Sequence, residues 1–316
     1  MTDMTSQPTS DIASVSLAQP LEDIADELGR SFAEFGFAVI RDHGIDQDLI
    51  ERAEEMSKAF FDLPEAVKLS YKIEGSGGAR GYTPFGTEKA KDAEIFDLKE
   101  FWHVGRELPA GHPLAQYMAA NVWPEEVAGF HQTFSDLYAA FDEAGLRVLE
   151  AIALHLGLER DFFAPTVENG NSVMRLLHYP PLGPDAPDGA IRAAAHGDIN
   201  TITLLLGAEE AGLELLTKAG EWHPVYAEEG ALVINVGDML ERLTAGALRS
   251  TTHRVVNPRG SGAQRSRYSM PFFLHFRPDY MITPLADCAA QDGAIVQPPI
   301  SAHDFLMQRL REINLA

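Results

Sequence analysis

The run Ala195-His196-Gly197-Asp198-Ile199-Asn200-Thr201-Ile202-Thr203 is the part of the chain on which the interpretation of the remainder depends. It places a histidine and an aspartate two positions apart at the start of a strand-like segment. Side chains alternate between the two faces of an extended strand, so His196 and Asp198 are predicted to share a face and to bind one ion. The triplet alone is weak evidence for a metal site, because a surface turn that leads into a strand can have the same sequence pattern.

The composition is that of a globular protein with an acidic surface. The 316 residues are 45% hydrophobic and 23% charged, which is enough apolar content to bury one large core or two small ones. Lys and Arg number 25 against 47 Asp and Glu, a net charge of −22 that repels phosphate backbones and anionic lipid headgroups. We therefore expect neither nucleic acid nor a membrane as a partner, and no apolar run approaches the roughly 18 residues of a membrane helix.

The cysteine content limits the metal chemistry. Cys288 is the only cysteine, which excludes an internal disulfide and a cysteine-based zinc site. Residues 1–20 show no basic segment followed by an apolar one, so no secretory signal is expected. These features predict a reducing, cytoplasmic location, in which any metal is held by histidine and carboxylate.

The first half of the sequence is mainly helical in pattern. Helical spacing of apolar residues predicts a helix over residues 21–35, ended by Gly36, and a short strand over 37–41. Asp46 is a candidate N-cap for a helix that runs to about Phe61, and Pro64 opens a third helix. The longest apolar stripe begins at Pro124 and continues to Leu156, where Gly157 closes it.

Two segments between these helices bear on function. Residues 75–82 are too rich in glycine for regular structure and predict a mobile loop, which lacks the Gly-Lys-Ser/Thr ending of a phosphate loop. Residues 97–104 predict a strand that carries His103, which we interpret as a structural or substrate-side residue. Loops and strand ends of this kind commonly select substrates.

From Val173 the pattern changes to short strands separated by turn residues, which is typical of a jelly roll. The predicted strands cover residues 173–179, 201–206, 213–217, around 225, 231–236, 253–257 and 268–276. We therefore expect an α+β protein, with a double-stranded β-helix (jelly roll) core and a mainly helical N-terminal region packed against it. The expected divisions are a polar arm at 1–20, a helical region at 21–168, the jelly roll at 169–282, and a loop and helix at 283–316.

A second group of polar residues follows the His-X-Asp triplet. His253 comes 57 residues after His196, which leaves room for strands that return to the same end of a jelly roll. Two histidines and one carboxylate are the set that holds non-haem iron(II) with three open positions, although a zinc hydrolase uses similar ligands. Arg267 and Ser269 share one strand face, and a guanidinium beside a hydroxyl suits capture of a carboxylate.

In this order the motifs resemble those of the iron(II)/2-oxoglutarate-dependent dioxygenases, in their isopenicillin N synthase-like branch. The family pattern His-X-Asp, distal His and Arg-X-Ser matches His196-Gly197-Asp198, His253 and Arg267-Tyr268-Ser269. Phe35-Gly36-Phe37 is similar to the N-terminal region of that branch, and Tyr179-Pro180-Pro181 is similar to its Tyr-Pro-Pro stretch. The resemblance covers nearly the whole chain.

The resemblance implies a division of roles among these residues. His196, Asp198 and His253 would hold Fe(II), and 2-oxoglutarate would bind the metal at one end and Arg267 with Ser269 at the other. Tyr179 and Arg175, which share strand parity, would also face the cosubstrate. Dioxygen would take the remaining position, and oxidative decarboxylation would yield succinate and carbon dioxide while a small organic substrate is hydroxylated or desaturated.

Several alternatives stay open at this point. The same iron site serves an oxidase that uses no 2-oxoglutarate, and it also serves an enzyme that fragments 2-oxoglutarate to ethylene. From other classes, a non-catalytic jelly-roll protein that senses 2-oxoglutarate and a zinc hydrolase have comparable residues. The sequence names neither the substrate nor the oligomeric state.

Overall fold

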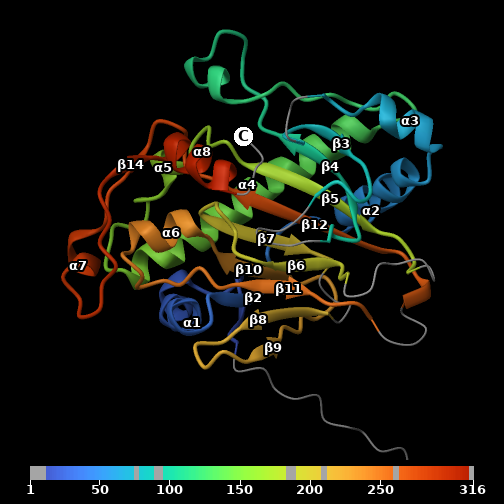
Figure 1. The fold of residues 1–316 in the computed structure, drawn as a ribbon. Coiled ribbons are helices and arrows are strands. Elements are labelled where there is room, and N and C mark those ends of the chain that lie inside the picture. The colour runs from blue at the N-terminus through green and yellow to red at the C-terminus, as the bar shows by residue number, and fades with distance from the viewer. Residues whose placement is uncertain are drawn as a thin grey trace, which may run out of the picture.

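Two facing β-sheets form the centre of the molecule (Figure 1). The computed structural model describes residues 12–74, 78–88, 95–182, 190–207, 212–258 and 263–312. The larger sheet has eight strands, in the order β1 (Ser14–Ser16), β2 (Phe37–Arg41), β10 (Leu232–Val236), β7 (Ile202–Leu206), β12 (Arg267–Leu274), β5 (Val173–Tyr179), β4 (Glu100–Gly105) and β3 (Gly81–Thr83).

The smaller sheet lies against one face of the larger sheet. Its four strands run in the order β6 (Ala193–His196), β11 (His253–Val255), β8 (Leu213–Leu216) and β9 (Trp222–Pro224). A two-stranded ribbon, β13 (Met281–Ile282) with β14 (Ile300–Ser301), lies near the C-terminus. Neighbouring strands are mostly distant in sequence, as in a jelly roll, and the predicted fold class is confirmed.

Helices cover the other face of the larger sheet (Figure 1). Helices α1, α2 and α4 pack on one another, and they contact strands β2, β7 and β12. The helical segments are α1 (Leu21–Glu34), α2 (Gln47–Phe61), α3 (Glu65–Ser70), the 3₁₀ turn η1 (Pro113–Tyr117), α4 (Phe130–His155), α5 (Ala164–Val167), α6 (Asp238–Leu243), α7 (Ala286–Ala289) and α8 (Ala302–Glu312). Among helices in the described ranges, none combines the length and apolar character that a membrane crossing requires.

Strand alternation divides the apolar residues between two cores. In β2, Ala38 and Ile40 join the core beneath the helices, whereas Phe37 and Val39 join the core between the sheets. Because both faces of this strand are covered, its sequence is a continuous apolar run. A third, separate cluster of Phe101, Leu177 and Tyr179 lies on the inner face of β4 and β5. Polar residues therefore occupy the part of the interior between the second and third clusters.

The structure corrects several predicted element boundaries. The long helix begins at Phe130 and not at Pro124, because Gly129 has a left-handed φ of 84° that an α-helix cannot include. Tyr82 lies in strand β3 and not in a loop, since the strand pairs with β4. Residues 75–77 of the predicted loop and residues 313–316 of the predicted C-terminal loop and helix lie outside the described residues.

The N-terminal residues contribute directly to the larger sheet. Strand β1, within the expected polar arm, pairs in parallel with β2. Strands β2, β3 and β4 also precede residue 168, yet β2 pairs with β10 and β4 pairs with β5. The larger sheet thus combines strands from both sides of the boundary that we expected near residue 168.

Candidate active site

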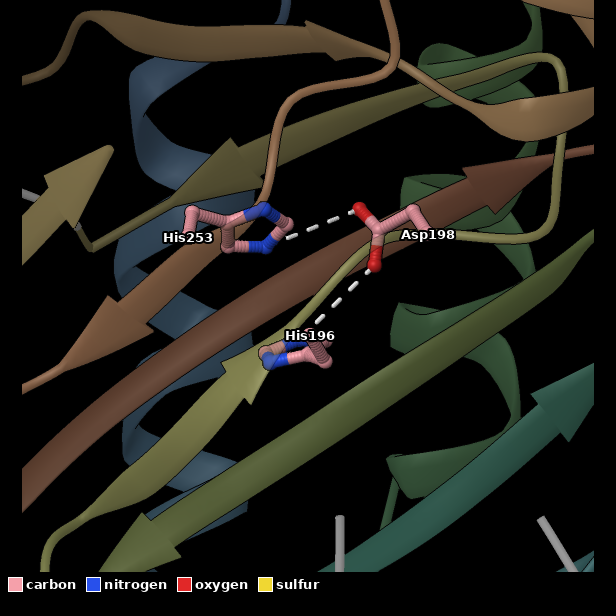
Figure 2. A group of neighbouring side chains, drawn as sticks. All are labelled: His196, Asp198 and His253. Atoms are coloured by element: carbon pink, nitrogen blue, oxygen red, sulfur yellow. Dashed lines mark ion pairs between the residues drawn. The ribbon is translucent and has the colours of Figure 1, made fainter. Parts of the chain in front are cut away.

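Three potential metal ligands converge where the smaller sheet meets strand β7 (Figure 2). His196 ends β6, His253 begins β11, and these two residues are direct partners in the sheet. Asp198 lies in the connection from β6 to β7; its Oδ1 is 3.9 Å from His196 Nε2, and its Oδ2 is 3.9 Å from His253 Nε2. One ligand atom from each residue lies within 4.8 Å of the others. The predicted convergence is confirmed.

The route by which the first two ligands meet differs from the prediction. We expected His196 and Asp198 to lie on the same face of one strand. Instead, β6 ends at His196, and β7 begins only at Ile202. A backbone hydrogen bond attaches the intervening turn to the start of α6: the Asp198 carbonyl accepts from the Asp238 N–H at 2.8 Å. A backbone turn therefore brings the carboxylate beside the imidazole.

Both histidines are oriented by backbone carbonyls. The Nδ1–H of His196 donates to the Ala194 carbonyl at 2.7 Å, and that of His253 donates to the Thr251 carbonyl at 3.1 Å. A histidine that donates from Nδ1 keeps the lone pair on Nε2, which is the form that binds a metal. Burial and the neighbouring His253 lower the pKa of His196 to about 4, so its imidazole is neutral at pH 7.

The carboxylate of Asp198 is also held in place. Its Oδ2 accepts hydrogen bonds from Thr203 Oγ1 at 2.5 Å and from Asn235 Nδ2 at 2.8 Å. Burial opposes ionisation, but the two imidazoles and these hydrogen bonds bring the pKa of Asp198 below its ordinary value. Two imidazoles and one fixed carboxylate are a donor set that fits a divalent ion such as Fe(II).

The site is open on one side only. The His196 side chain retains 36% of its exposure, whereas those of Asp198 and His253 retain 6% and 9%. The ring of Phe37 packs edge-on against His253, with the ring centroids 5.4 Å apart. A small molecule would therefore approach from the His196 side, toward strands β4 and β5.

The predicted carboxylate-binding residues lie on the inner face of the larger sheet. Arg267 on β12 is the direct partner of Tyr179 on β5, and Ser269 is the partner of Leu177. Side chains of directly paired residues share a face, so all four point inward. Arg267 is 2% exposed, and its Nε and Nη1 have no hydrogen-bond partner among the described residues, while Nη2 only approaches the Gly207 carbonyl at 3.4 Å. A buried guanidinium in this state lacks an acceptor.

Arg175 shares the inner face with Tyr179, as predicted from strand parity, but its charge is already paired. Its Nη1 and Nη2 contact the two carboxylate oxygens of Glu88 at 3.1 and 3.2 Å, and its Nε donates to His103 Nε2 at 2.6 Å. These contacts distinguish it from Arg267, whose Nε and Nη1 have no hydrogen-bond partner among the described residues. A cosubstrate-binding role for Arg175 stays a prediction.

Comparison with known proteins connects this geometry to a family. Residues 8–126 match the model described as non-haem dioxygenase in morphine synthesis N-terminal, and residues 170–276 match the 2OG-Fe(II) oxygenase superfamily. A 2-oxoglutarate-Fe(II) type oxidoreductase of Emericella nidulans is 34% identical over 86% of this chain and 79% of its own length. The chain belongs to the iron(II)/2-oxoglutarate-dependent oxygenases, in the isopenicillin N synthase-like family.

Solved structures of oxygenases agree along nearly the whole chain. A 2OG-Fe(II) oxygenase family protein from Caulobacter crescentus is 55% identical, with a TM-score of 0.90 over 96% of this chain and all of that one. A full-length protein of Neurospora crassa, solved in complex with alpha-KG, is 27% identical, with a TM-score of 0.84 over 95% of each chain. The triad of His196, Asp198 and His253 is thus the Fe(II) site of a 2-oxoglutarate-dependent dioxygenase.

Sequence reasoning missed the residues that support this oxygenase's ligands. Asn235 had a visible signal, because it is a lone polar residue in the apolar run Ala231-Leu232-Val233-Ile234-Asn235-Val236. Thr203 offered none, since threonine is common in strands. The sequence analysis also did not single out Glu88 and Lys99; Lys99 is buried, and Glu88, with 16% of its side chain exposed, contacts both Lys99 and Arg175.

Proposed function

We propose that this dioxygenase oxidises a small organic molecule by hydroxylation or desaturation, while 2-oxoglutarate is converted to succinate and carbon dioxide. The observation that carries this proposal is the buried Arg267 guanidinium, with two nitrogens that lack a partner among the described residues. It lies on the same inner face as Thr203 and Asn235, which hold the iron ligand Asp198. A dicarboxylate that reaches from the triad to Arg267 supplies the missing acceptor.

Each residue has a distinct role in this reaction. The guanidinium of Arg267 and the hydroxyl of Ser269 bind the far carboxylate of 2-oxoglutarate, and Tyr179 borders it from the neighbouring strand. His196, Asp198 and His253 hold the metal, and their hydrogen bonds to Ala194, Thr251, Thr203 and Asn235 fix the ligands. Bound Fe(II) supplies coordination of 2-oxoglutarate and activation of dioxygen. The ring of Phe37, packed edge-on against His253, keeps water from that side of the metal site.

Arg267→Ala tests the cosubstrate assignment. We expect the dissociation constant for 2-oxoglutarate to rise by about 100-fold, because a buried charge-assisted pair is lost. Calorimetric titration of the anaerobic Fe(II)-loaded protein measures it, and Arg52→Ala on an exposed helix position is the matched control. Unchanged affinity in Arg267→Ala would contradict the assignment. Arg267→Lys keeps the positive charge but not the planar guanidinium. Its dissociation constant for 2-oxoglutarate should lie between those of the wild type and Arg267→Ala.

The products of the reaction distinguish related activities. Succinate release coupled to oxygen consumption supports the proposal, whereas oxygen consumption without succinate indicates an oxidase that does not use 2-oxoglutarate. Ethylene in the headspace indicates fragmentation of 2-oxoglutarate. The first compounds for the substrate screen come from relatives: the Neurospora crassa protein was crystallised with thymine, and a relative from Petromyces alliaceus, 33% identical, is a proline hydroxylase.

The wider setting of the enzyme is inferred from composition. The net charge of −22 disfavours nucleic acid as a partner, and the single cysteine favours a reducing cytoplasmic location. Fractionation of cells that produce the protein tests the location.

A further inference from the structure

A group of ionisable residues lines the inner face of the larger sheet beside the iron site. Lys99, Phe101 and His103 alternate toward this face along β4 and the residue before it, and His103 is the direct partner of Arg175 on β5. Lys99 and His103 are 7% and 8% exposed. We call Glu88, Asp97, Lys99, His103 and Arg175 the charged wall. Burial of so many charges is costly, and such groups are often functional.

The charged wall is connected without a break. Glu88 Oε2 contacts Lys99 Nζ at 2.6 Å, and Asp97 Oδ2 contacts the same ammonium group at 2.8 Å. Glu88 also forms the two-pronged pair with Arg175, whose Nε donates to His103. His103 Nδ1 in turn donates to the Gly78 carbonyl at 2.5 Å. His103 is neutral, because burial and the Arg175 charge lower its pKa well below the ordinary value.

The charged wall borders the open side of the iron site. Asp97 Oδ1 accepts a hydrogen bond of 2.9 Å from the Ala194 N–H, and the carbonyl of Ala194 holds His196. The same Asp97 binds Lys99 Nζ through its Oδ2 at 2.8 Å. His196 is the most exposed of the three ligands, so the charged wall lies next to the ligand that a small molecule can reach most easily.

The charges of the wall balance internally. Two cations, Arg175 and Lys99, face two carboxylates, Glu88 and Asp97, and every carboxylate oxygen has a partner. Arg175 has five N–H donors, of which the contacts to Glu88 and His103 use three. Its side chain and that of Glu88 each retain 16% exposure, so a ligand can reach them. The wall therefore offers donors without a net charge.

We propose that the primary substrate presents an uncharged group with a hydrogen-bond acceptor to the charged wall, and that Glu88 sets this specificity by neutralising Arg175 and Lys99. The proposal rests on the proposed function, because it names the substrate of that reaction. A carboxylate or ammonium group placed here would lose its water without gaining a counter-charge, which is unfavourable. An uncharged carbonyl or amide accepts from Arg175 and packs on the apolar cluster of Phe101, Leu177 and Tyr179.

The structure also offers a competing route for an anionic substrate. Arg80 is 3% exposed, and its guanidinium packs over Gly105, two residues beyond His103 on β4. It donates to the carbonyls of Ala79 and Ala119, but its Nη2 has no partner among the described residues. If the substrate is an acid, Arg80 is the group that would bind it, and the variant Arg80→Met distinguishes that case.

The test compares two probes of similar shape and different charge. Benzamide and benzoate are titrated by calorimetry into wild type and Glu88→Gln, each loaded with Mn(II) and 2-oxoglutarate so that no turnover occurs. We expect the affinity ratio of benzoate to benzamide to rise by about tenfold or more in Glu88→Gln, because Arg175 and Lys99 then share one carboxylate. An unchanged ratio, including no binding of either probe by either protein, overturns the proposal.

Two further variants complete the test. Arg175→Gln leaves the wall one positive charge short, so it should gain affinity for the cation benzamidine by about tenfold; this keeps the proposal testable if Glu88→Gln does not fold. Preference of wild type for benzoate, lost in Arg80→Met, would overturn the proposal in favour of an acidic substrate. Binding of 2-oxoglutarate is measured first in each protein, so failure of the proposed function is recognised separately from failure of the wall assignment.

Discussion

The iron centre and the charged wall are neighbours, but they are built in different ways. At the iron centre each ligand has a hydrogen-bond partner nearby in the sequence, namely Ala194 for His196, Thr251 for His253 and Thr203 for Asp198, and only Asp198 has a distant partner as well, in Asn235. In the wall, Arg175 binds His103 from 72 positions away and Glu88 from 87. Local hydrogen bonds thus fix the chemistry of the site, whereas the packing of distant strands fixes what the site recognises.

The largest expected effect is loss of the carboxylate ligand. Asp198→Ala should reduce iron affinity and substrate-dependent succinate release by far more than about 100-fold, the upper figure for removing a residue that only orients a ligand. Circular dichroism confirms the fold, and Asp287→Ala at an exposed position is the control. Retained activity with undiminished iron affinity would contradict the role of Asp198.

A smaller effect is expected one contact further from the metal. Asn235→Leu fills similar volume but removes the hydrogen bond to Asp198 Oδ2, while Thr203 keeps its own. Iron affinity should fall by about 10- to 100-fold. Competition with a coloured chelator measures it. If affinity is unchanged, the distant hydrogen bond from Asn235 is not needed to hold the centre, and the local partners of the ligands suffice.

The same contrast explains what the sequence could predict. His196, Asp198 and His253 are few, chemically specific and ordered along the chain, so both the metal triad and the jelly roll were predicted correctly. The turn that carries Asp198 and the start of α4 at Phe130 depend on backbone conformation, which residue spacing does not encode. The wall was not predicted, because Arg175 comes beside His103 only when β5 pairs with β4, and its contact with Glu88 joins residues 87 positions apart.

A change in the wall should affect stability more than iron binding. Asp97→Asn keeps an acceptor for the Ala194 N–H but removes one of the two carboxylates on Lys99. Because Glu88 remains on Lys99, the loss of unfolding free energy should be about 2 kcal/mol, less than for a buried pair broken outright. Urea unfolding measures it, with Asp287→Asn as control. A fall in iron affinity as large as that expected for Asn235→Leu would show that wall and centre form one unit.

The smallest effect concerns His275, a buried residue just after strand β12. Burial lowers its pKa to about 4, and the charges of both Asp198 and Arg80 reach it. Its Nδ1–H donates to the Phe273 carbonyl at 2.9 Å. In the unfolded chain a histidine has a pKa of about 6.5, so the unfolded state binds more protons between these values. The contribution of neutral His275 to the free energy of unfolding is therefore complete above pH 6.5, and it is lost as the pH falls toward 4.

From pH 7 to pH 5.5 this single histidine should remove about 1 kcal/mol of unfolding free energy. His275→Gln cannot titrate, so its unfolding free energy should fall less than that of wild type over this range. Urea unfolding of the metal-free proteins at both pH values measures the difference, and other histidines cancel because both proteins contain them. His131→Gln at an exposed site should leave the wild-type slope unchanged. If the unfolding free energies of His275→Gln and wild type change equally with pH, His275 is not held neutral. The acid sensitivity then comes from groups of the iron centre or the charged wall.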